Sequence, residues 1–387
     1  MRAVVVGGAG WMGSTAARTA AAFPEFAEIV IADRNRGEAE RVADHIGPKA
    51  RAVAFDADRD DPGELLDGCW GVLSTLGPFT RFGTRILAAA IEAGCRYVDI
   101  NDDWEPTLDA LELDARARDR GVTALIGMGA SPGVTNLLAV RAGRELDETE
   151  ELMTGWALAG TSPEVPGSGP SAAMLHFVHQ CTGTIPVVEN GDWRDVSPFQ
   201  VVSLDYPGIG EIRTRTIGHP EVVTLPRAFP GLRRCANLMS GPEWYFERVH
   251  EVLARVEART LTDTEAAVQL DQPQARPADA PPTVRTPTLW AWASGVRDGR
   301  PTTVGAGLTR WPAGKMAGST GIPAAIGLRL LARGDITATG VVTPETAVPA
   351  DAFFAEFDPF CTQPDGTDGA LVSVTRGEVT AMPQGSR

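Results

Sequence analysis

A glycine-rich segment close to the N-terminus constrains the fold of this chain more strongly than any other feature. It reads G-x-G-x-x-G and consists of Gly8, Ala9, Gly10, Trp11, Met12 and Gly13. The apolar run 2–6 precedes it and the alanine-rich stretch 14–22 follows it, so we expect a strand, a tight turn and a helix. In that arrangement Gly8 permits the turn, Gly10 lets the backbone approach a pyrophosphate, and Gly13 lets helix and strand pack closely. The segment therefore predicts a dinucleotide-binding turn, with a glycine turn that binds no ligand as the alternative.

A carboxylate stands at the position where a dinucleotide site needs one. Asp33 ends the second apolar run, 28–33, twenty residues beyond Gly13. A carboxylate there accepts hydrogen bonds from the adenosine ribose hydroxyls and repels a 2′-phosphate, which favours NAD over NADP. Arg34 and Arg36 follow directly, and an arginine at this place is able to hold a 2′-phosphate, so NADP stays open. The alternative for both arginines is a solvated surface position.

Strands alternate with helices along the first third of the chain. The expected strands are 2–6, 28–33, 50–55, 71–76, 96–100 and 122–127. The expected helices are 14–22, 36–46, 62–66, 84–93 and 106–120. This alternation predicts an α/β fold with a Rossmann-type, doubly wound parallel sheet.

A short turn follows the fourth expected strand and contains Thr75, Gly77 and Pro78. In a doubly wound sheet the carboxyl end of this strand meets the nicotinamide half of a dinucleotide. We therefore expect these three residues to contact the cofactor. A plain strand-to-helix turn is the alternative.

After Gly133 the alternation gives way to a mixed pattern. The expected helices are 134–146, 171–181, 241–259 and 322–331, and strand-like runs occupy 151–160, 200–217, 288–294 and 302–308. The last two runs flank Arg297-Asp298-Gly299-Arg300, which is a hairpin signal. The proline-rich stretch 271–287 is expected to be a loop that is mobile or disordered.

The composition excludes several classes of protein. Lysine and arginine number 35 against 50 aspartates and glutamates, a net charge of −15, which argues against a nucleic-acid binder. The five cysteines are scattered and lack a C-x-x-C pair, which indicates neither a disulfide framework nor a zinc site and agrees with a reducing compartment. The start lacks a signal-peptide pattern, and no apolar stretch of about 20 residues occurs to span a membrane. We therefore expect a cytoplasmic protein with neither a nucleic-acid nor a membrane partner.

Several short motifs along the chain point to the same family of proteins. They are the glycine-rich segment, Gly-Pro-Phe at 77–79, Ala-Ala-x-x-Ala-Gly-x-x-Tyr-Val-Asp at 89–99, and Gly-Ala-Ser-Pro-Gly-Val-Thr-Asn at 129–136. Together they resemble the saccharopine dehydrogenase family, which includes lysine 6-dehydrogenase-like enzymes. The segments 316–326 and 340–345 are similar to the last helix and closing segment of that family, whereas the middle of the chain matches loosely.

The resemblance implies a domain organisation and an activity. It implies a Rossmann domain (1–135), an inserted α/β substrate domain with a mixed sheet (136–312), and a C-terminal segment that returns to the Rossmann domain (313–387). It also implies hydride transfer at a C–N bond of an amino-acid-like or polyamine-like substrate, by amine oxidation or imine reduction. We further expect a homodimer.

Polar residues follow the fifth and sixth expected strands. Asp99 ends the fifth strand and Asp102 lies three residues further on, where a carboxylate would bind a substrate ammonium. The alternative is a solvated turn that caps the next helix. The segment Ser131–Asn136 opens a helix after the sixth strand, and its free backbone amides suit a substrate carboxylate, with an ordinary helix start as the alternative.

Two histidines, His176 and His179, lie three residues apart on an expected helix. This spacing, without a third ligand, does not make the usual zinc pattern, so we expect no metal. Imidazole titrates near neutrality, which makes His176 our candidate base, with a half-buried structural histidine as the alternative. Glu221 stands two residues after His219 in the loosely matching middle, and we expect it near the substrate.

These observations predict an NAD(P)-dependent dehydrogenase or reductase whose small-molecule substrate carries amine and carboxylate groups. The catalytic candidates are His176, Asp99, Asp102 and Glu221. The cofactor-binding candidates are Gly8, Gly10, Trp11, Met12, Gly13, Asp33, Arg34, Thr75, Gly77 and Pro78. A reductase of C=C or C=O bonds and a non-catalytic dinucleotide sensor are the alternatives, because one fold hosts many functions.

Overall fold

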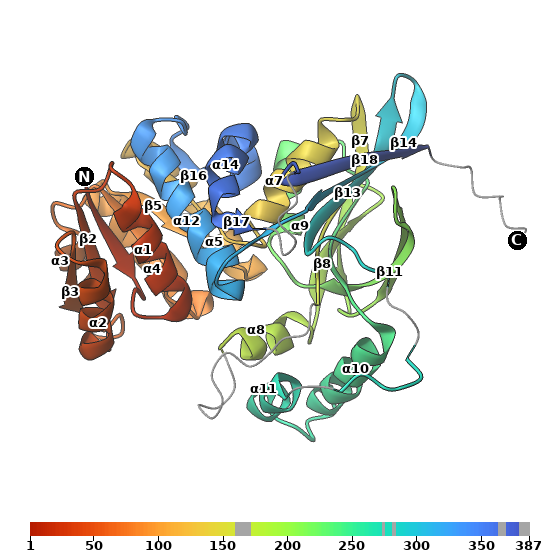
Figure 1. Ribbon diagram of the computed structural model, residues 1–387, viewed down its shortest axis with the longest axis horizontal. Coiled ribbons are helices and arrows are strands. Elements are labelled where there is room, and N and C mark those ends of the chain that lie inside the picture. The colour runs from red at the N-terminus through yellow and green to blue at the C-terminus, as the bar shows by residue number, and fades with distance from the viewer. Residues whose placement is uncertain (159–171, 273–274, 281–283, 363–368, 379–387) are drawn as a thin grey trace, which may run out of the picture. The chain divides into compact units, whose positions relative to one another are not determined.

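The computed structural model describes residues 1–158, 172–272, 275–280, 284–362 and 369–378 (Figure 1). The chain divides into two compact units. The first combines Met1–Leu137 with Thr309–Leu371, and the second combines Leu138–Leu308 with the segment that begins at Val372. Each unit is therefore built from two stretches that are far apart in the sequence.

A parallel sheet forms the centre of the first unit. Its strands are β1 (Arg2–Val6), β2 (Glu28–Asp33), β3 (Ala50–Ala54), β4 (Gly71–Ser74), β5 (Arg96–Asp99), β6 (Thr123–Leu125) and β16 (Gly340–Val342). They pair in the order β16–β6–β5–β4–β1–β2–β3, and every neighbouring pair is parallel. The apolar runs of β1, β2 and β4 suit their places in this sheet, because these strands are buried on both faces. The predicted Rossmann-type sheet is confirmed.

Helices of the first unit connect and cover these strands. They are α1 (Trp11–Ala22), α2 (Arg36–Ile46), α3 (Pro62–Leu66), α4 (Phe79–Ala93), α5 (Trp104–Glu112), α6 (Asp114–Asp119), α12 (Lys315–Arg333), α13 (Pro344–Ala347) and α14 (Ala350–Phe357). Side-chain oxygens of Asn35 and Asp61 cap α2 and α3. The long helix α12 packs against α1, β4 and β5, so the C-terminal stretch returns to the Rossmann core as expected.

Several expected helix boundaries in this unit were wrong. The expected helix 106–120 is interrupted at Leu113, which separates α5 from α6. Helix α4 begins at Phe79 rather than residue 84, because Pro78 already takes the extended N-cap conformation. Helix α12 begins at Lys315 rather than residue 322, and it continues through Pro323.

A mixed sheet forms the centre of the second unit. Its path is β10 (Val201–Tyr206), β11 (Gly210–Ile217), β12 (Arg234–Ser240), β7 (Glu148–Ala157), β13 (Leu289–Arg297), β14 (Arg300–Leu308) and β18 (Val372–Glu378). In addition, β8 (Ile185–Glu189) pairs with both β12 and β9 (Asp192–Val196). Strands β12 and β7 are parallel, and the other pairs are antiparallel. The inserted mixed-sheet domain is therefore confirmed.

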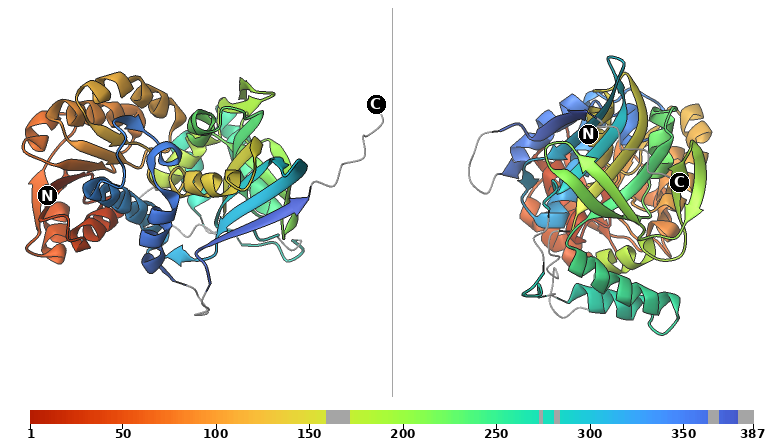
Figure 2. Two further views of the ribbon diagram at one scale, coloured as in Figure 1. Left: turned by 90° about the horizontal axis from the view of Figure 1, so that it is seen from above. Right: turned by 90° about the vertical axis from the view of Figure 1, so that its right-hand side faces the viewer.

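The remaining helices are α7 (Val134–Gly143), α8 (Ala172–Gln180), α9 (Glu221–Ala228), α10 (Glu243–Glu257) and α11 (Asp263–Asp271). Four of them belong to the second unit, whereas α7 begins in the first unit and ends in the second. Helices α8, α10 and α11 share an apolar cluster that includes Phe177, Phe246 and Leu253, and α10 and α11 lie side by side (Figure 2). Of the expected proline-rich loop 271–287, residues 273–274 and 281–283 lie outside the described residues.

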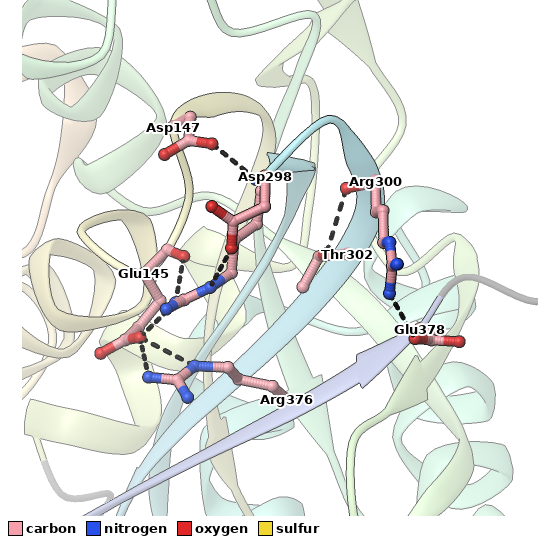
Figure 3. A network of polar contacts seen from close by, with 8 residues as sticks. Glu145, Asp147, Asp298, Arg300, Thr302, Arg376 and Glu378 are labelled. Atoms are coloured by element: carbon pink, nitrogen blue, oxygen red, sulfur yellow. Dashed lines mark hydrogen bonds and ion pairs between the residues drawn. The ribbon is translucent and has the colours of Figure 1, made fainter.

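The C-terminal stretch contributes to both units. Within the expected segment 313–387, the residues up to Leu371 belong to the first unit, whereas β18 pairs antiparallel with β14 in the second (Figure 2). Glu145 holds this strand in place (Figure 3). Its carboxylate accepts hydrogen bonds from Arg376 Nε on β18 and from Arg297 Nη1 on β13, each at 2.8 Å. Among the described residues, no helix is both long and apolar enough to cross a membrane.

Candidate functional site

The carboxyl ends of four strands meet at one edge of the parallel sheet. Strand β1 lies between β4 and β2, and the strand order reverses between β1 and β4. Ligands of doubly wound sheets bind at such a reversal, beyond the carboxyl ends of the strands. The turns that follow β1, β4, β5 and β6 all begin at this edge, and they contain or border most of the predicted site residues of the first unit.

The glycine-rich turn after β1 leaves its ligand-facing side open. Gly7 has a φ of +73°, which favours glycine, and a Cβ atom on Gly13 would lie 2.2 Å from the carbonyl oxygen of Gly7. Gly13 thus lets strand and helix approach, as predicted. A Cβ atom on Gly10 would meet one described atom within 4 Å, the Gly7 oxygen at 3.2 Å. Since no described side chain caps α1, the first amides of the helix suit a pyrophosphate.

Trp11 and Met12 begin helix α1 beside this turn. The indole of Trp11 is exposed and Met12 is half-buried. The carbonyl oxygen of Met12 faces α12, where a Cβ atom on Gly321 would lie 2.6 Å from it. Only a glycine therefore lets α12 pack this close to the start of α1, and the C-terminal stretch supports the nucleotide turn.

Asp33 holds the same turn from the end of β2. Its Oδ2 atom accepts a hydrogen bond from Ala9 N at 3.1 Å, and its Oδ1 atom accepts one from Asn35 N at 2.9 Å. Each carboxylate oxygen has a second acceptor site, so ribose hydroxyls are still able to donate to it. Arg34 is exposed, whereas the guanidinium of Arg36 pairs with Glu40 at 2.8 Å.

The turn after β4 combines a positioning residue with an open surface. Thr75 Oγ1 donates to the carbonyl oxygens of Val6 and Gly7, each at 3.1 Å, so this side chain fixes the nucleotide turn. Gly77 and Pro78 are exposed, and a Cβ atom on Gly77 would meet no described atom within 4 Å. The surface at Gly77 and Pro78 is therefore open.

Asp99 ends β5 with a buried carboxylate. Its Oδ1 atom accepts hydrogen bonds from Gly127 N at 2.7 Å and from Asn101 N at 3.1 Å. Burial raises the pKa of Asp99 to about 6, and the two backbone hydrogen bonds oppose this rise. Tyr97 is fully buried on the same strand, and its pKa is raised well above the ordinary value by burial and by the charge of Asp99. Asp99 thus links the turn after β5 to the turn after β6.

The turn between β5 and α5 is organised by an asparagine that the sequence analysis did not single out. Asn101 Oδ1 accepts a hydrogen bond from Asp103 N, and its Nδ2 atom donates to Thr107 Oγ1 at 2.8 Å. These bonds form an Asx-type start for the helix. Asp102 is half-buried between these two anchored neighbours.

The segment after β6, residues 127–136, is a tightly bonded loop that we call the β6 loop. Gly129 N donates to Pro132 O, and Val134 N donates to Gly129 O. Gly133 has a φ of +119°, and a Cβ atom there would lie 2.2 Å from Gly129 O, so the loop requires glycine at this position. Within the β6 loop, Ala130 and Ser131 are partly exposed and the other residues are buried.

The predicted residues of the second unit lie on different elements. His176 is half-buried on α8, whereas Glu221 is fully buried at the start of α9. His219 Nδ1 lies 3.4 Å from Glu221 Oε2, and the imidazole lies 6.4 Å from the ring of Trp156. This buried imidazole–carboxylate pair was not predicted as a pair, although the two residues are separated by Pro220 alone.

Comparisons with known proteins agree with this geometry. Residues 4–125 match the saccharopine dehydrogenase NADP binding domain. The chain is 26% identical to carboxyaminopropylagmatine dehydrogenase from Synechocystis over 92% of this chain and 95% of that protein. Among solved structures it is similar to saccharopine dehydrogenase (L-Glu forming) from Saccharomyces cerevisiae, with a TM-score of 0.66 and 16% identity, covering 97% of this chain and 99% of that one. It is also similar to homospermidine synthase from Legionella pneumophila in complex with NAD, with a TM-score of 0.59 and 13% identity, covering 100% and 93%.

The sheet edge and its turns define the class of the protein, an NAD(P)-dependent oxidoreductase with a Rossmann domain. Its residues 4–125 match the saccharopine dehydrogenase NADP binding domain, which confirms the resemblance inferred from the sequence, and the match to saccharopine dehydrogenase confirms the fold. NAD(P) as the cofactor is confirmed with it.

Proposed function

We propose that the protein transfers a hydride at a C–N bond of a substrate that carries amine and carboxylate groups. The observation that carries this proposal is the convergence of the glycine-rich turn, the turn after β4, the Asp99 turn and the β6 loop on one edge of the parallel sheet. The relative that matches along nearly the whole chain is named as a dehydrogenase of carboxyaminopropylagmatine, whose name combines an amine chain with a carboxyl group. This supports a polyamine-like substrate with a carboxylate.

In this proposal, different residues of the first unit bind different parts of the cofactor and the substrate. Gly8, Gly10 and Gly13 with the first amides of α1 bind the pyrophosphate, and Asp33 binds the adenosine ribose. A carboxylate at position 33 favours NAD over NADP, and Arg34 is the residue that a 2′-phosphate would use. Gly77 and Pro78 lie beside the nicotinamide, which supplies or accepts the hydride when bound. Asp99 and Asp102 belong to the turn that faces the substrate amine, and the β6 loop receives its carboxylate.

His176 is the proton-transfer group of this proposal. His176 would take the proton of the substrate amine, because a neutral imidazole nitrogen accepts a proton. Glu221 acts through His219, since a fully buried carboxylate orients an imidazole more readily than it meets a ligand. A homodimer and a cytoplasmic location stay predictions.

Steady-state kinetics on a panel of amino acids, polyamines, carboxylated polyamines and their imines tests this function. Absorbance of the reduced nicotinamide is followed with NAD and NADP in parallel. We expect turnover with at least one carboxylated secondary amine or its imine, and a higher kcat/KM with NAD. If no amine or imine changes the absorbance of the reduced nicotinamide, the protein is a reductase of C=C or C=O bonds or a dinucleotide sensor.

Replacement of one histidine tests the proton-transfer group. His176→Ala should lower kcat by about 10²- to 10⁴-fold and leave the Kd of NADH unchanged, because general acid–base catalysis contributes a factor of this size. His179→Ala is the matched control, since His179 lies on the same helix but is exposed and pairs with Asp263 at 3.1 Å. Equal kinetics of the two variants would assign the base elsewhere, with His219 as the next candidate.

A further inference from the structure

An asparagine at the end of the β6 loop links that loop to the C-terminal stretch. Asn136 is fully buried in the first turn of α7. Its Oδ1 atom accepts a hydrogen bond from Gly133 N at 2.8 Å. Because a backbone N–H requires an acceptor, this bond determines which side of the amide is the oxygen. The Nδ2 atom therefore points the other way, and it donates to Glu345 Oε2 at 2.8 Å.

Glu345 is held in place by its own surroundings in the first unit. It lies in the first turn of α13, directly after β16, and β16 pairs in parallel with β6. A capping box between Thr343 and Thr346 fixes the start of this short helix. The strand that leads into the β6 loop and the strand that leads to Glu345 are thus neighbours in one sheet.

The β6 loop is consequently anchored at both ends by carboxylates. At the beginning of the loop, Asp99 accepts a hydrogen bond from Gly127 N. At its end, Asn136 accepts a hydrogen bond from Gly133 N and donates one to Glu345. The part between these anchors exposes Ala130 and Ser131. An anchored loop presents its exposed backbone and hydroxyl groups in one geometry, which lowers the entropy lost on binding a ligand.

We propose that Glu345 is a positioning residue for substrate binding: through Asn136 it holds the β6 loop so that Ser131 faces the substrate. The proposal rests on the function proposed above. Glu345 does not touch the substrate itself, and its charge strengthens the hydrogen bond from Asn136 Nδ2. A glutamine at this position still offers an oxygen to Nδ2, so Glu345→Gln should preserve the anchor, whereas Glu345→Ala removes it.

Hydrogen exchange of the full-length protein tests the anchor without any substrate. In Glu345→Ala, the amides of residues 129–137 should exchange faster than in the natural protein. In Glu345→Gln, their exchange rates should stay close to those of the natural protein. Glu356→Ala is the matched control, because Glu356 is a partly buried carboxylate of the same C-terminal stretch that pairs with Arg333 at 2.7 Å. It should lower the Tm and leave exchange in 129–137 unchanged. Unchanged exchange of the β6 loop in Glu345→Ala would overturn the proposal.

Kinetics then test what the anchored loop does. Glu345→Ala should raise the KM of the amine substrate about tenfold, the size expected from one charge-assisted hydrogen bond, with the Kd of NADH unchanged. Glu345→Gln should restore most of this loss, and Glu356→Ala should leave the KM unchanged. An equal KM in Glu345→Ala and the natural protein, despite faster loop exchange, would overturn the positioning role. If the natural protein turns over no amine or imine, the proposed function fails, and the exchange data alone support or overturn the anchor.

Discussion

Asp99 lies in an environment that departs from what its residue type suggests. An ordinary aspartate is ionised at neutral pH, yet burial raises the pKa of Asp99 to about 6. The ionised form is therefore less favourable in the folded protein than in the unfolded chain. Carboxyl groups with a pKa raised by burial are frequent at functional sites, where an acid or base needs a pKa close to the working pH.

The sign of this shift predicts how stability depends on pH. The folded pKa lies above the unfolded value of 3.8, so the contribution of Asp99 is fully present below about pH 4 and declines as the pH rises through 6. A rise of about two pKa units corresponds to roughly 3 kcal/mol. Asp99→Asn keeps an oxygen for both backbone donors without the charge, so it should raise the Tm at pH 7.5 and flatten the profile between pH 4 and 6. A profile as steep as that of the natural protein would contradict this, and Asp109→Asn, at an exposed aspartate of α5, is the control.

Residues whose role depends on near neighbours in the sequence were predictable. The three glycines and Asp33 lie within one strand–turn–helix–strand unit, and their spacing alone placed them at the sheet edge. The positioning role of Thr75 was not predictable, because its hydroxyl reaches Val6 and Gly7 across 69 and 68 residues. The hydrogen bond from Asn136 to Glu345 spans 209 residues, so no local sequence pattern predicts it.

At the scale of elements, strand β18 is held by charge as well as by its ladder to β14. Arg376 and Arg297 lower the pKa of Glu145, with the hydrogen bond from Arg376 contributing most (Figure 3). The folded pKa lies below the unfolded value, so this stabilisation is present above the unfolded pKa and is lost as the pH falls through the folded one. Glu145, two residues beyond the end of α7, therefore contacts both β13 and β18.

Glu145→Gln should loosen the C-terminal strand. Because the side chain is about a quarter exposed, we expect a loss of roughly 1 to 2 kcal/mol, which is modest for two charge-assisted contacts. Limited proteolysis should cleave near 372–378 faster than in the natural protein, and high salt should narrow the difference. Glu378→Gln is the control, since its contact with Arg300 is exposed and 3.9 Å long. Equal proteolysis of the two variants would contradict the role of Glu145.

The elements of the first unit were predicted better than those of the second. Parallel strands buried on both faces leave continuous apolar runs, whereas β9 is mostly exposed and has no such run. Strands β8 and β12 and helices α9 and α11 were missed as well, because their apolar patterns are short or are mixed with polar residues. Strand β18 follows six residues outside the described ones, and its pairing with β14 depends on tertiary contacts alone.

At the scale of the whole molecule, each unit needs both stretches of the chain that build it. The fragment 1–137 contains the complete glycine-rich turn but lacks α12, whose buried face packs on α1, β4 and β5. We expect this fragment alone to bind no NADH in a fluorescence titration, and co-expression with 309–371 to restore binding. NADH binding by the isolated fragment with the affinity of the full chain would contradict this expectation.

The position of α12 in the sequence also has a consequence for synthesis on the ribosome. The 1–137 stretch emerges first, and the 309–371 stretch that covers it follows after the whole intervening unit. At about 5 to 20 residues per second, this interval lasts roughly 10 to 35 s. During that time the sheet face later covered by α12 is an exposed apolar surface, which is the kind of surface that chaperones bind. The nucleotide turn can therefore become functional only after translation has passed the last residues of α12.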